Sequence, residues 1–417
     1  MINQTFLPRI INLFLFPAVF FFSSSAHAQI KGCTDPLANN YSSIAGMNDG
    51  SCIYSPATMN VTSSTTLPVQ MKGTSGLIWM NNKLWTQNNF SDINLYSFEP
   101  AQTTSFQSMQ ASGTINVDWE EMTQDEQYLY IGDFGNNVNG NRTNLQILRI
   151  QKSSMTQSAL VIDTIRFSYA TQTNFSPTGA NKTNYDCEAF IVSKDSIYLF
   201  TKEWLTNKTS IYRLPKTKGT HSATFISSFD VQGLITGASF LESKRLLVLC
   251  GYSSTLQPFV YLLYDYPGYR FFEGNKRKIA LNLPFHQAEA IATQDGLNYH
   301  LTNEAFSQSG ISVPQKLHQL NMSAYISGYL STTSANDLYF SNAVRLYPVP
   351  ANTMLYADLP VNKTAVTYRI MNSQGAVVQQ GMWNKSNAGI DVSHLVKGTY
   401  WILFSADKSY IRQWVKQ

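Results

Sequence analysis

Residues 118–133 read DWEEMTQDEQYLYIGD, and residues 186–203 read DCEAFIVSKDSIYLFTKE. Each stretch contains an acidic triplet, a short apolar run, a polar turn, a second apolar run and a final charged residue. Weaker copies begin at Ser75, Thr236 and Gln287, so the starts of the five copies lie 43, 68, 50 and 51 residues apart. Repeats near this period that hold several short strands are typical of the blades of a β-propeller. We therefore predict a propeller of five to six blades over residues 67–325.

The composition supports an all-β fold. Charged residues make up only 13% of the 417 residues and aromatic residues another 13%, which is typical of an extracellular β-rich protein. Apolar runs such as YLYIGD and RLLVLCGY have the length of strands and are bounded by turn residues, so no helix is predicted between residues 67 and 325. The net charge of +4 is spread too thinly to indicate a nucleic-acid partner.

The first 28 residues have the pattern of a secretory signal peptide. Arg9 precedes a largely apolar run over residues 10–22, and the small residues Ala26 and Ala28 follow, which predicts cleavage after Ala28. This run is shorter than the roughly 20 residues that span a bilayer, and no later stretch is long enough. We expect no transmembrane segment in the mature chain.

Residues 29–54 are predicted to form a short module that contains two cysteines. Cys33 and Cys52 close a turn-rich loop directly after the cleavage site, and in an exported protein such a pair is expected to form a disulfide. The segment resembles a short calcium-associated module of secreted Bacteroidetes proteins, with Asp49-Gly50 before the second cysteine. That resemblance implies Ca²⁺ at Asp35 and Asp49, although Asn48 replaces one of its usual two acids. A disulfide-stapled turn without metal explains the segment equally well.

The two remaining cysteines, Cys187 and Cys250, fall in or beside expected strands. We predict that both are buried, unpaired thiols.

Residues 346–417 begin with LYPVPAN, continue through MNSQGAVVQQ and HLVKGTYWILFS, and end in IRQWVKQ. This order resembles the C-terminal sorting domain of type IX secretion, with matches at Tyr347, Pro348, Pro350, Gly375, Leu395, Gly398, Tyr400 and Lys416. The resemblance implies a partner in the type IX machinery and delivery through the periplasm to the cell surface or the medium. The strand pattern predicts a small immunoglobulin-like sandwich of about seven antiparallel strands, with Gly375 and Gly398 at turns.

The propeller region resembles, more loosely, secreted phytase-like and esterase-like propellers of the Bacteroidetes. The resemblance rests on the order of the stretches that begin at Ser75, Asp118, Asp186 and Gln287. Where that family commonly has a His-Asn-Asp-Ser-Gly corner, residues 87–91 read QNNFS. A catalytic role carried by that corner is therefore in doubt.

Equivalent positions of the innermost strands converge at one end of a propeller, so the acidic triplets predict an acidic site there. Such carboxylates need protons, a partner such as Lys202 or Arg142, or a bridging cation, for which Ca²⁺ or Mg²⁺ is the natural choice. Alternatively, the acids only satisfy backbone donors of neighbouring blades. The candidate ligands are Asp118, Glu120, Asp186, Glu188 and Glu289.

Two functions remain open at this stage. The first is a propeller that binds an extracellular ligand or partner at its acidic channel mouth, with a divalent cation in place. The alternative is a metal-assisted hydrolase of phosphate or carboxyl esters, with Glu120 or Glu188 as base and Lys202 neutralising developing charge. The predicted fold cannot choose between them, because propellers host both.

Overall fold

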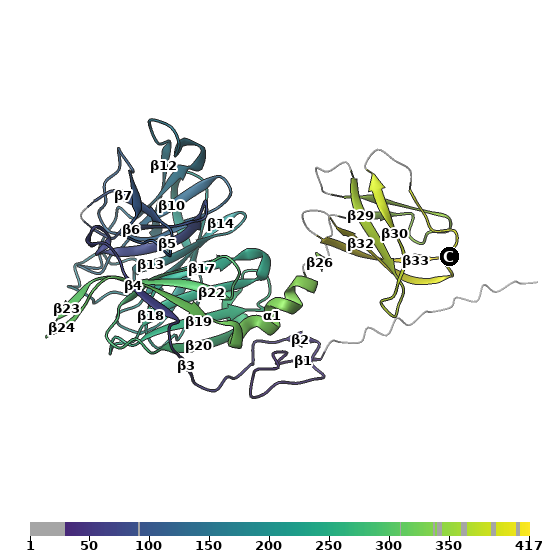
Figure 1. Ribbon diagram of the computed structural model, residues 1–417, viewed down its shortest axis with the longest axis horizontal. Helices are drawn as coiled ribbons and strands as arrows, with labels where there is room; N and C mark the ends of the chain where they lie inside the picture. The colour runs from purple at the N-terminus through teal and green to yellow at the C-terminus, as the bar shows by residue number, and fades with distance from the viewer. Residues whose placement is uncertain are drawn as a thin grey trace, which may run out of the picture.

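The computed structural model describes residues 30–417 except 91, 309, 337, 340–343, 360–364, 385–388 and 406–408. The predicted signal peptide, residues 1–28, lies outside the described residues. Figure 1 shows a short N-terminal module in purple, a purple-to-green propeller and a yellow C-terminal β domain. The prediction of an all-β fold is confirmed. No helix among the described residues is long and apolar enough to cross a membrane.

The propeller has five blades, each an antiparallel sheet of four strands. The first holds β5 (Thr74–Met80), β6 (Lys83–Asn88), β7 (Asn94–Phe98) and β8 (Phe106–Gln110), and the second β9 (Trp119–Gln124), β10 (Tyr128–Asp133), β11 (Gln146–Gln151) and β12 (Ile162–Tyr169). The third holds β13 (Asp186–Val192), β14 (Ser196–Lys202), β15 (Thr209–Pro215) and β16 (Gly219–Phe229), and the fourth β17 (Leu234–Leu241), β18 (Leu246–Tyr252), β19 (Pro258–Tyr264) and β20 (Asn275–Leu281). The fifth holds β21 (Ala288–Thr293), β22 (Asn298–Asn303), β25 (Lys316–Asn321) and β4 (Ser63–Thr66).

The ring closes after five blades. The first strand of each blade contacts the next in the circular order β5, β9, β13, β17, β21 and back to β5. The outermost strand of the fifth blade is β4, which comes from the N-terminal side and pairs with β25, so that Thr65 faces Leu317. This pairing covers an edge that would otherwise remain open.

The segment over residues 55–66 contributes strands to the propeller although its sequence is rich in Ser and Thr. Besides β4 it contains β3 (Ala57–Met59), which pairs in parallel with β20. All four residues of β4 are exposed, and an outer strand with polar exposed side chains has the composition of a linker. A second edge contact joins β12 to β16 in parallel, so the second and third blades form one eight-stranded sheet.

The continuous apolar runs of the sequence are the strands packed between neighbouring blades. Every residue of β13, β18 and β19 is buried, because both faces of these strands meet other sheets. Near the axis the first strands almost touch. A Cβ on Gly76 would lie 2.3 Å from the backbone N of Met122, and a Cβ on Gly237 would lie 2.4 Å from the backbone O of Glu289. Only glycine fits at these two points.

A helix begins in the last three residues of the region that was predicted to contain none, and most of it lies beyond that region. Helix α1 (Ser323–Asn336) begins where the Asn321 side chain accepts a hydrogen bond from the Ser323 N–H at 3.1 Å. Its side chains Ile326 and Leu330, one helical turn apart, are buried against the fourth and fifth blades. The described part of the propeller also contains short 3-10 turns at η1 (Val69–Met71), η2 (Lys152–Ser154), η3 (Glu242–Lys244) and η4 (Phe271–Glu273), and a hairpin of β23 (Phe306–Gln308) and β24 (Ile311–Val313) between β22 and β25.

The N-terminal module is tied to the fourth blade. It contains the short strands β1 (Lys31–Gly32) and β2 (Met47–Asn48), and the predicted disulfide joins Cys33 to Cys52. The Asn48 side chain donates to Asp265 Oδ2 at 3.0 Å, and the Tyr264 hydroxyl donates to Asp35 Oδ2. The module is therefore docked rather than freely tethered. Cys187 and Cys250 are buried free thiols, as predicted.

The C-terminal domain is a two-sheet sandwich around its own core. One sheet contains β26 (Leu338–Tyr339), β33 (Ser409–Lys416), β32 (Gly398–Ser405), β29 (Ala365–Met371) and β30 (Val377–Asn384). The other contains β27 (Arg345–Tyr347), β28 (Met354–Asp358) and β31 (Ile390–Asp391). Gly375 lies in the turn between β29 and β30 with φ of 79°, whereas Gly398 is the first residue of β32.

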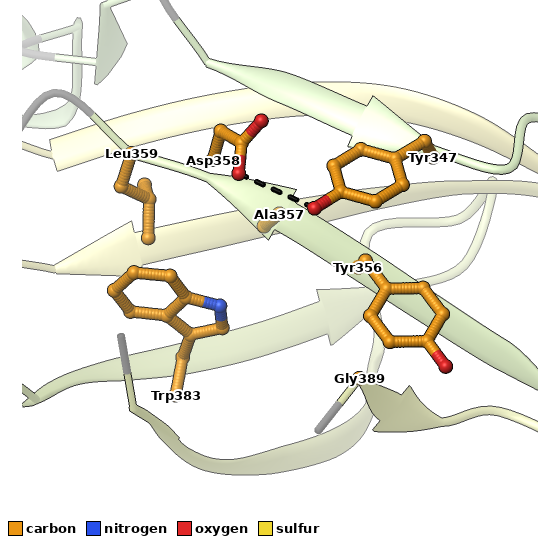
Figure 2. A pocket seen from close by; sticks show the side chains of 7 residues that line it. All are labelled: Tyr347, Tyr356, Ala357, Asp358, Leu359, Trp383 and Gly389. Atoms are coloured by element: carbon orange, nitrogen blue, oxygen red, sulfur yellow. Dashed lines mark hydrogen bonds between the residues drawn. The ribbon is translucent and has the colours of Figure 1, made fainter. Parts of the chain in front are cut away.

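A cavity of about 220 Å³ in this domain is lined by Tyr347, Tyr356, Ala357, Asp358, Leu359, Trp383 and Gly389. Figure 2 shows its lining, in which Asp358 accepts a hydrogen bond from the Tyr347 hydroxyl at 3.3 Å and Trp383 lies on the opposite side from Tyr356. The rings of Tyr347 and Tyr356 stack with centroids 5.6 Å apart.

Candidate functional site

The candidate site is built from a β-bulge that recurs at the start of every first strand. In the second blade Trp119 pairs with Asp133 and Glu121 with Gly132, which leaves Glu120 as the extra residue. The same irregularity leaves Glu188, Thr236 and Glu289 in the next three blades, and Ser75–Gly76 together oppose Gln87 in the first. Bulges turn a side chain away from the regular alternation of a strand. These residues therefore form one ring at the end of the propeller where the first strands begin, which we call the mouth.

The repeated triplet in the sequence locates the bulge residue correctly in three blades. In the other two blades the triplet is misaligned with the bulge. Glu120, Glu188 and Glu289 were each the last residue of a repeated triplet. In the fourth blade the bulge falls on Thr236, so the triplet taken to begin there is displaced by two residues. The fourth blade has no acidic residue at this position, so its repeat could be aligned with the others only by its glycine.

Carboxylates from different blades meet at the mouth. A Cβ added to Gly135 would lie 2.2 Å from Asp118 Oδ2 and 2.4 Å from Glu120 Oε1, so both carboxylates reach the same glycine. Glu120 Oε2 also accepts a hydrogen bond from the Ser75 hydroxyl of the first blade at 3.3 Å. Asp186 accepts from the Asn136 N–H at 2.6 Å and from the Trp204 indole at 2.7 Å.

Lys202 is the cation among these acids. Its ammonium donates to Glu188 Oε2 at 2.5 Å, and both side chains are only 4% exposed. The fields of Glu188, Glu289 and Asp186 raise the pKa of Lys202 well above its ordinary value, against the opposing effect of burial. The ammonium also lies over the rings of Trp204 and Tyr252, at 4.7 and 5.1 Å. Arg142, the other predicted partner, instead pairs with Asp133 at 2.8 Å.

Negative groups therefore outnumber positive ones at the mouth. We use the name acidic cluster for Asp118, Glu120, Asp186, Glu188, Glu289 and Glu304 with Lys202. Glu304 directly follows the second strand of the fifth blade, helps to raise the pKa of Glu289 through its charge, and accepts a hydrogen bond from the Asn89 amide at 3.5 Å. Asp118 and Glu304 are partly exposed, whereas the other members are buried.

Burial and mutual repulsion raise the pKa values of these carboxyl groups. Burial, with the field of Asp186, raises the pKa of Asp118 to about 6. Burial is also the main cause that raises the pKa of Glu188 to about 8, although Lys202 opposes it. The pKa values of Glu120 and Glu289 are raised well above their ordinary range, again chiefly by burial. The cluster therefore holds protons near neutral pH, which a positively charged group could replace.

Glu121, next to Glu120, has a structural role that the sequence did not indicate. Its fully buried carboxylate accepts backbone N–H groups from Met122 and Ala238 at 2.9 Å and from Leu77 at 3.3 Å. It thus ties β9 to β5 and to β17 across the axis. The alternative interpretation, in which acids satisfy backbone donors of other blades, describes Glu121 and one oxygen of Asp186. The only available signal was that Glu121 follows Glu120 directly.

The other predicted metal ligands have different partners. Asp35 accepts from the hydroxyls of Tyr54, at 2.7 Å, and Tyr264, while Asp49 is exposed and accepts from the Ser51 N–H at 3.0 Å. Within the described ranges, no three His, Cys, Asp or Glu side chains are arranged to hold a metal ion. At the QNNFS corner, both amide atoms of buried Gln87 lack a hydrogen-bond partner.

Comparison with known proteins identifies one part of the chain. Residues 345–417 match the family model described as the secretion system C-terminal sorting domain. The chain ends in a type IX sorting domain. It is therefore exported by type IX secretion to the cell surface or the medium, and the type IX machinery is its partner.

Solved structures resemble the chain only distantly. The exo-β-1,3-galactanase of Phanerochaete chrysosporium is 10% identical with a TM-score of 0.35, and the match covers 91% of this chain and 93% of that one. The GH32 β-fructofuranosidase of Bombyx mori is 12% identical with a TM-score of 0.38, over 85% and 89%. A Dyadobacter fermentans protein of unknown function is 9% identical with a TM-score of 0.34, over 63% and 98%. No curated protein matches the sequence. None of these likenesses bears on activity.

Proposed function

We propose that the propeller is a secreted binding module whose ligand places positive charge in the acidic cluster at the mouth. One observation carries this proposal. Six carboxyl groups from the second, third and fifth blades gather at the mouth, whereas Lys202 is already paired with Glu188 and Arg142, which acts on Asp118, is already paired with Asp133. A cation that enters the mouth would replace the protons that these groups hold.

The smallest ligand of this kind is a divalent cation, and Ca²⁺ suits a site with only oxygen donors. Carboxylates of Asp118 and Glu120 reach a common point beside Gly135, and Glu188 and Glu289 lie in the same electrostatic environment. These side chains would have to adjust to surround an ion, since the described residues contain no ready-made metal cage. Uptake of Ca²⁺ should release protons as it proceeds.

A thermal shift assay on the mature chain tests this proposal. A ligand that binds only the folded state stabilises it by about 2.7 kcal/mol at a hundredfold excess over Kd, so Ca²⁺ should raise the melting temperature. Glu120→Gln with Glu188→Gln should abolish the rise. Asp49→Asn is the matched control for the N-terminal module, which should not be deleted because it docks on the fourth blade. An identical rise in wild type and in the double variant would refute the proposal.

A hydrolase at the same mouth is the second candidate. The observation in its favour is the contact between Lys202 and Glu188, which pairs a potential base with a cation that could neutralise developing charge. A screen of phosphate and carboxyl esters, with and without chelator, separates the two functions. Turnover that Glu188→Gln and chelation both remove would establish the hydrolase, and its absence in a Ca²⁺-binding protein would favour the binding module.

A further inference from the structure

Apolar side chains surround the acidic mouth and are scarce on the opposite face of the propeller. The mouth face is formed by the loops that follow each second strand and those that lead into each first strand. Twelve large apolar side chains of the described propeller are exposed, and eight of them lie on these loops. They are Val69, Phe90, Ile115, Val117, Val138, Phe175, Leu205 and Phe285. On the described loops of the opposite face, the exposed large apolar side chains are Val161 and Tyr269.

These side chains are strongly exposed although they sit beside well-packed blades. Ile115 is 73% exposed, Val138 65% and Leu205 62%. They come from the loops of at least three blades, so they encircle the mouth rather than form one stripe. Soluble proteins rarely gather apolar groups in this way unless another surface covers them.

The charge at the centre indicates what covers them. Asp118 follows Val117 directly and Glu304 follows the last residue of β22. Both are partly exposed, so a group that approaches the ring meets these carboxyl groups first. A side-chain amide without a hydrogen-bond partner also lies beside the ring. The unpartnered amide of Gln87 is fully buried, and its oxygen lies 2.7 Å from the place of a Cβ on Gly76, at the bulge of the first blade.

We propose that the mouth face docks a polypeptide partner that inserts a lysine or arginine side chain into the acidic cluster, where Asp118 and Glu304 are the partly exposed carboxyl groups, while its apolar neighbours cover the surrounding loops. This inference rests on the proposed function, since it names the ligand class of the same mouth. The combination of a buried charged anchor with an apolar surround is typical of protein–protein hot spots. The same loops also carry Lys72, Lys182 and Lys208, so a single basic side chain at the centre matches the face better than a broadly basic surface does.

A lipid surface is the competing occupant of exposed apolar loops. The acidic cluster argues against it, because burying uncompensated carboxylates against hydrocarbon is strongly unfavourable. Anionic lipid headgroups would also be repelled by the same charge.

Selection from a random peptide library displayed on phage tests the proposal, with the full mature chain as bait. We expect enriched peptides that contain a lysine or arginine flanked by apolar residues. The best synthetic peptide should bind at least about tenfold more weakly to Asp118→Asn with Glu304→Gln, and to Leu205→Ser, than to wild type. Val161→Ser on the opposite face is the matched control and should leave binding unchanged. Replacing the basic residue of the peptide with glutamine should have the same effect as the Asp118 and Glu304 changes.

Three outcomes would overturn the inference. The first is a selection whose peptides show no preference for wild type over a bait with the Asp118 and Glu304 changes. The second is a set of peptides whose binding survives both sets of mouth variants. The third is co-sedimentation with phosphatidylcholine or phosphatidylglycerol vesicles that depends on Leu205, which would assign the face to lipid. If Ca²⁺ still raises the melting temperature through Glu120 and Glu188 in any of these cases, the proposed function stands and only the polypeptide partner is refuted.

Discussion

Replacing Glu188 with glutamine should make the propeller more stable at neutral pH, because burial raises the pKa of this carboxyl group in the folded chain. Burial raises the pKa of Glu188 from its ordinary 4.5 to about 8. The folded chain therefore keeps this proton at pH values where the unfolded chain has lost it. Its contribution to stability is fully present below pH 4.5 and is lost as the pH rises toward 8.

At about 1.36 kcal/mol per pH unit, raising the pH from about 5 to about 7.5 should lower the free energy of unfolding by about 3 kcal/mol through this group. Glutamine at position 188 has nearly the same shape, can still accept from Lys202, and does not titrate. We expect wild type and Glu188→Gln to have similar stability at about pH 5, and the variant to be more stable by up to about 3 kcal/mol at about pH 7.5.

Urea unfolding of the mature chain in the presence of EDTA, followed by tryptophan fluorescence at both pH values, measures this difference. Glu273→Gln is the control, because Glu273 pairs with Arg270 at the surface with 58% of its side chain exposed. An exposed pair contributes less than about 1 kcal/mol, and its loss should not alter the pH dependence. Parallel pH profiles for wild type and Glu188→Gln would refute the reasoning. Such profiles would mean that the Glu188 carboxyl group stays ionised beside Lys202 and carries no proton in the folded chain at these pH values.

Three further outcomes are expected from changes outside the acidic cluster. Truncation before residue 346 should leave the propeller folded but abolish delivery to the cell surface, as cell fractionation would show; undiminished display would contradict the sorting role. Gly76→Ala should destabilise the chain by about 3 kcal/mol in calorimetry, because its Cβ would lie 2.3 Å from a backbone nitrogen. Replacing Ser64 and Thr65 with proline should release β4 from β25 and cause aggregation through the exposed edge, visible by light scattering; a monodisperse variant would show that closure is dispensable.

Much of the architecture could be predicted because the repeat marks the same structural position in every blade. An acidic residue at the bulge is followed by a first strand, a turn and a second strand, and the spacing of Glu120 and Glu188 preserved this unit. The outer strands carry no such marker. The polar strand β4 is fully exposed, so its place in the fifth blade depends on a partner about 250 residues later.

The convergence of the acidic residues at one end of the propeller could be predicted, but their pairing with basic residues could not. The converging positions followed from the repeat, whereas the pairing of Lys202 with Glu188, and of Arg142 with Asp133, depends on loop paths that sequence periodicity does not encode. Gly135 illustrates the point. It lets Asp118 and Glu120 approach each other, and no pattern in the sequence distinguished it from other loop glycines.

The neighbouring residues Glu120 and Glu121 show how the same side chain can serve binding or structure. Both oxygens of the Glu121 carboxylate accept backbone N–H groups, from three strands in total. Glutamine has only one acceptor oxygen, so Glu121→Gln would set its amide N–H₂ against a backbone N–H, at a cost of about 1–3 kcal/mol. Burial raises the pKa of the Glu121 carboxyl well above its ordinary value, so this cost is largest at a pH where the carboxyl is ionised in the folded chain. That sign is opposite to the one expected for Glu188→Gln at neutral pH. The free energies of unfolding of the two variants, measured in urea under the same conditions, would therefore distinguish acidic residues that stabilise the propeller from acidic residues that are available to bind a positively charged ligand. A gain of stability in Glu121→Gln would show that its three hydrogen bonds do not repay the burial of its charge.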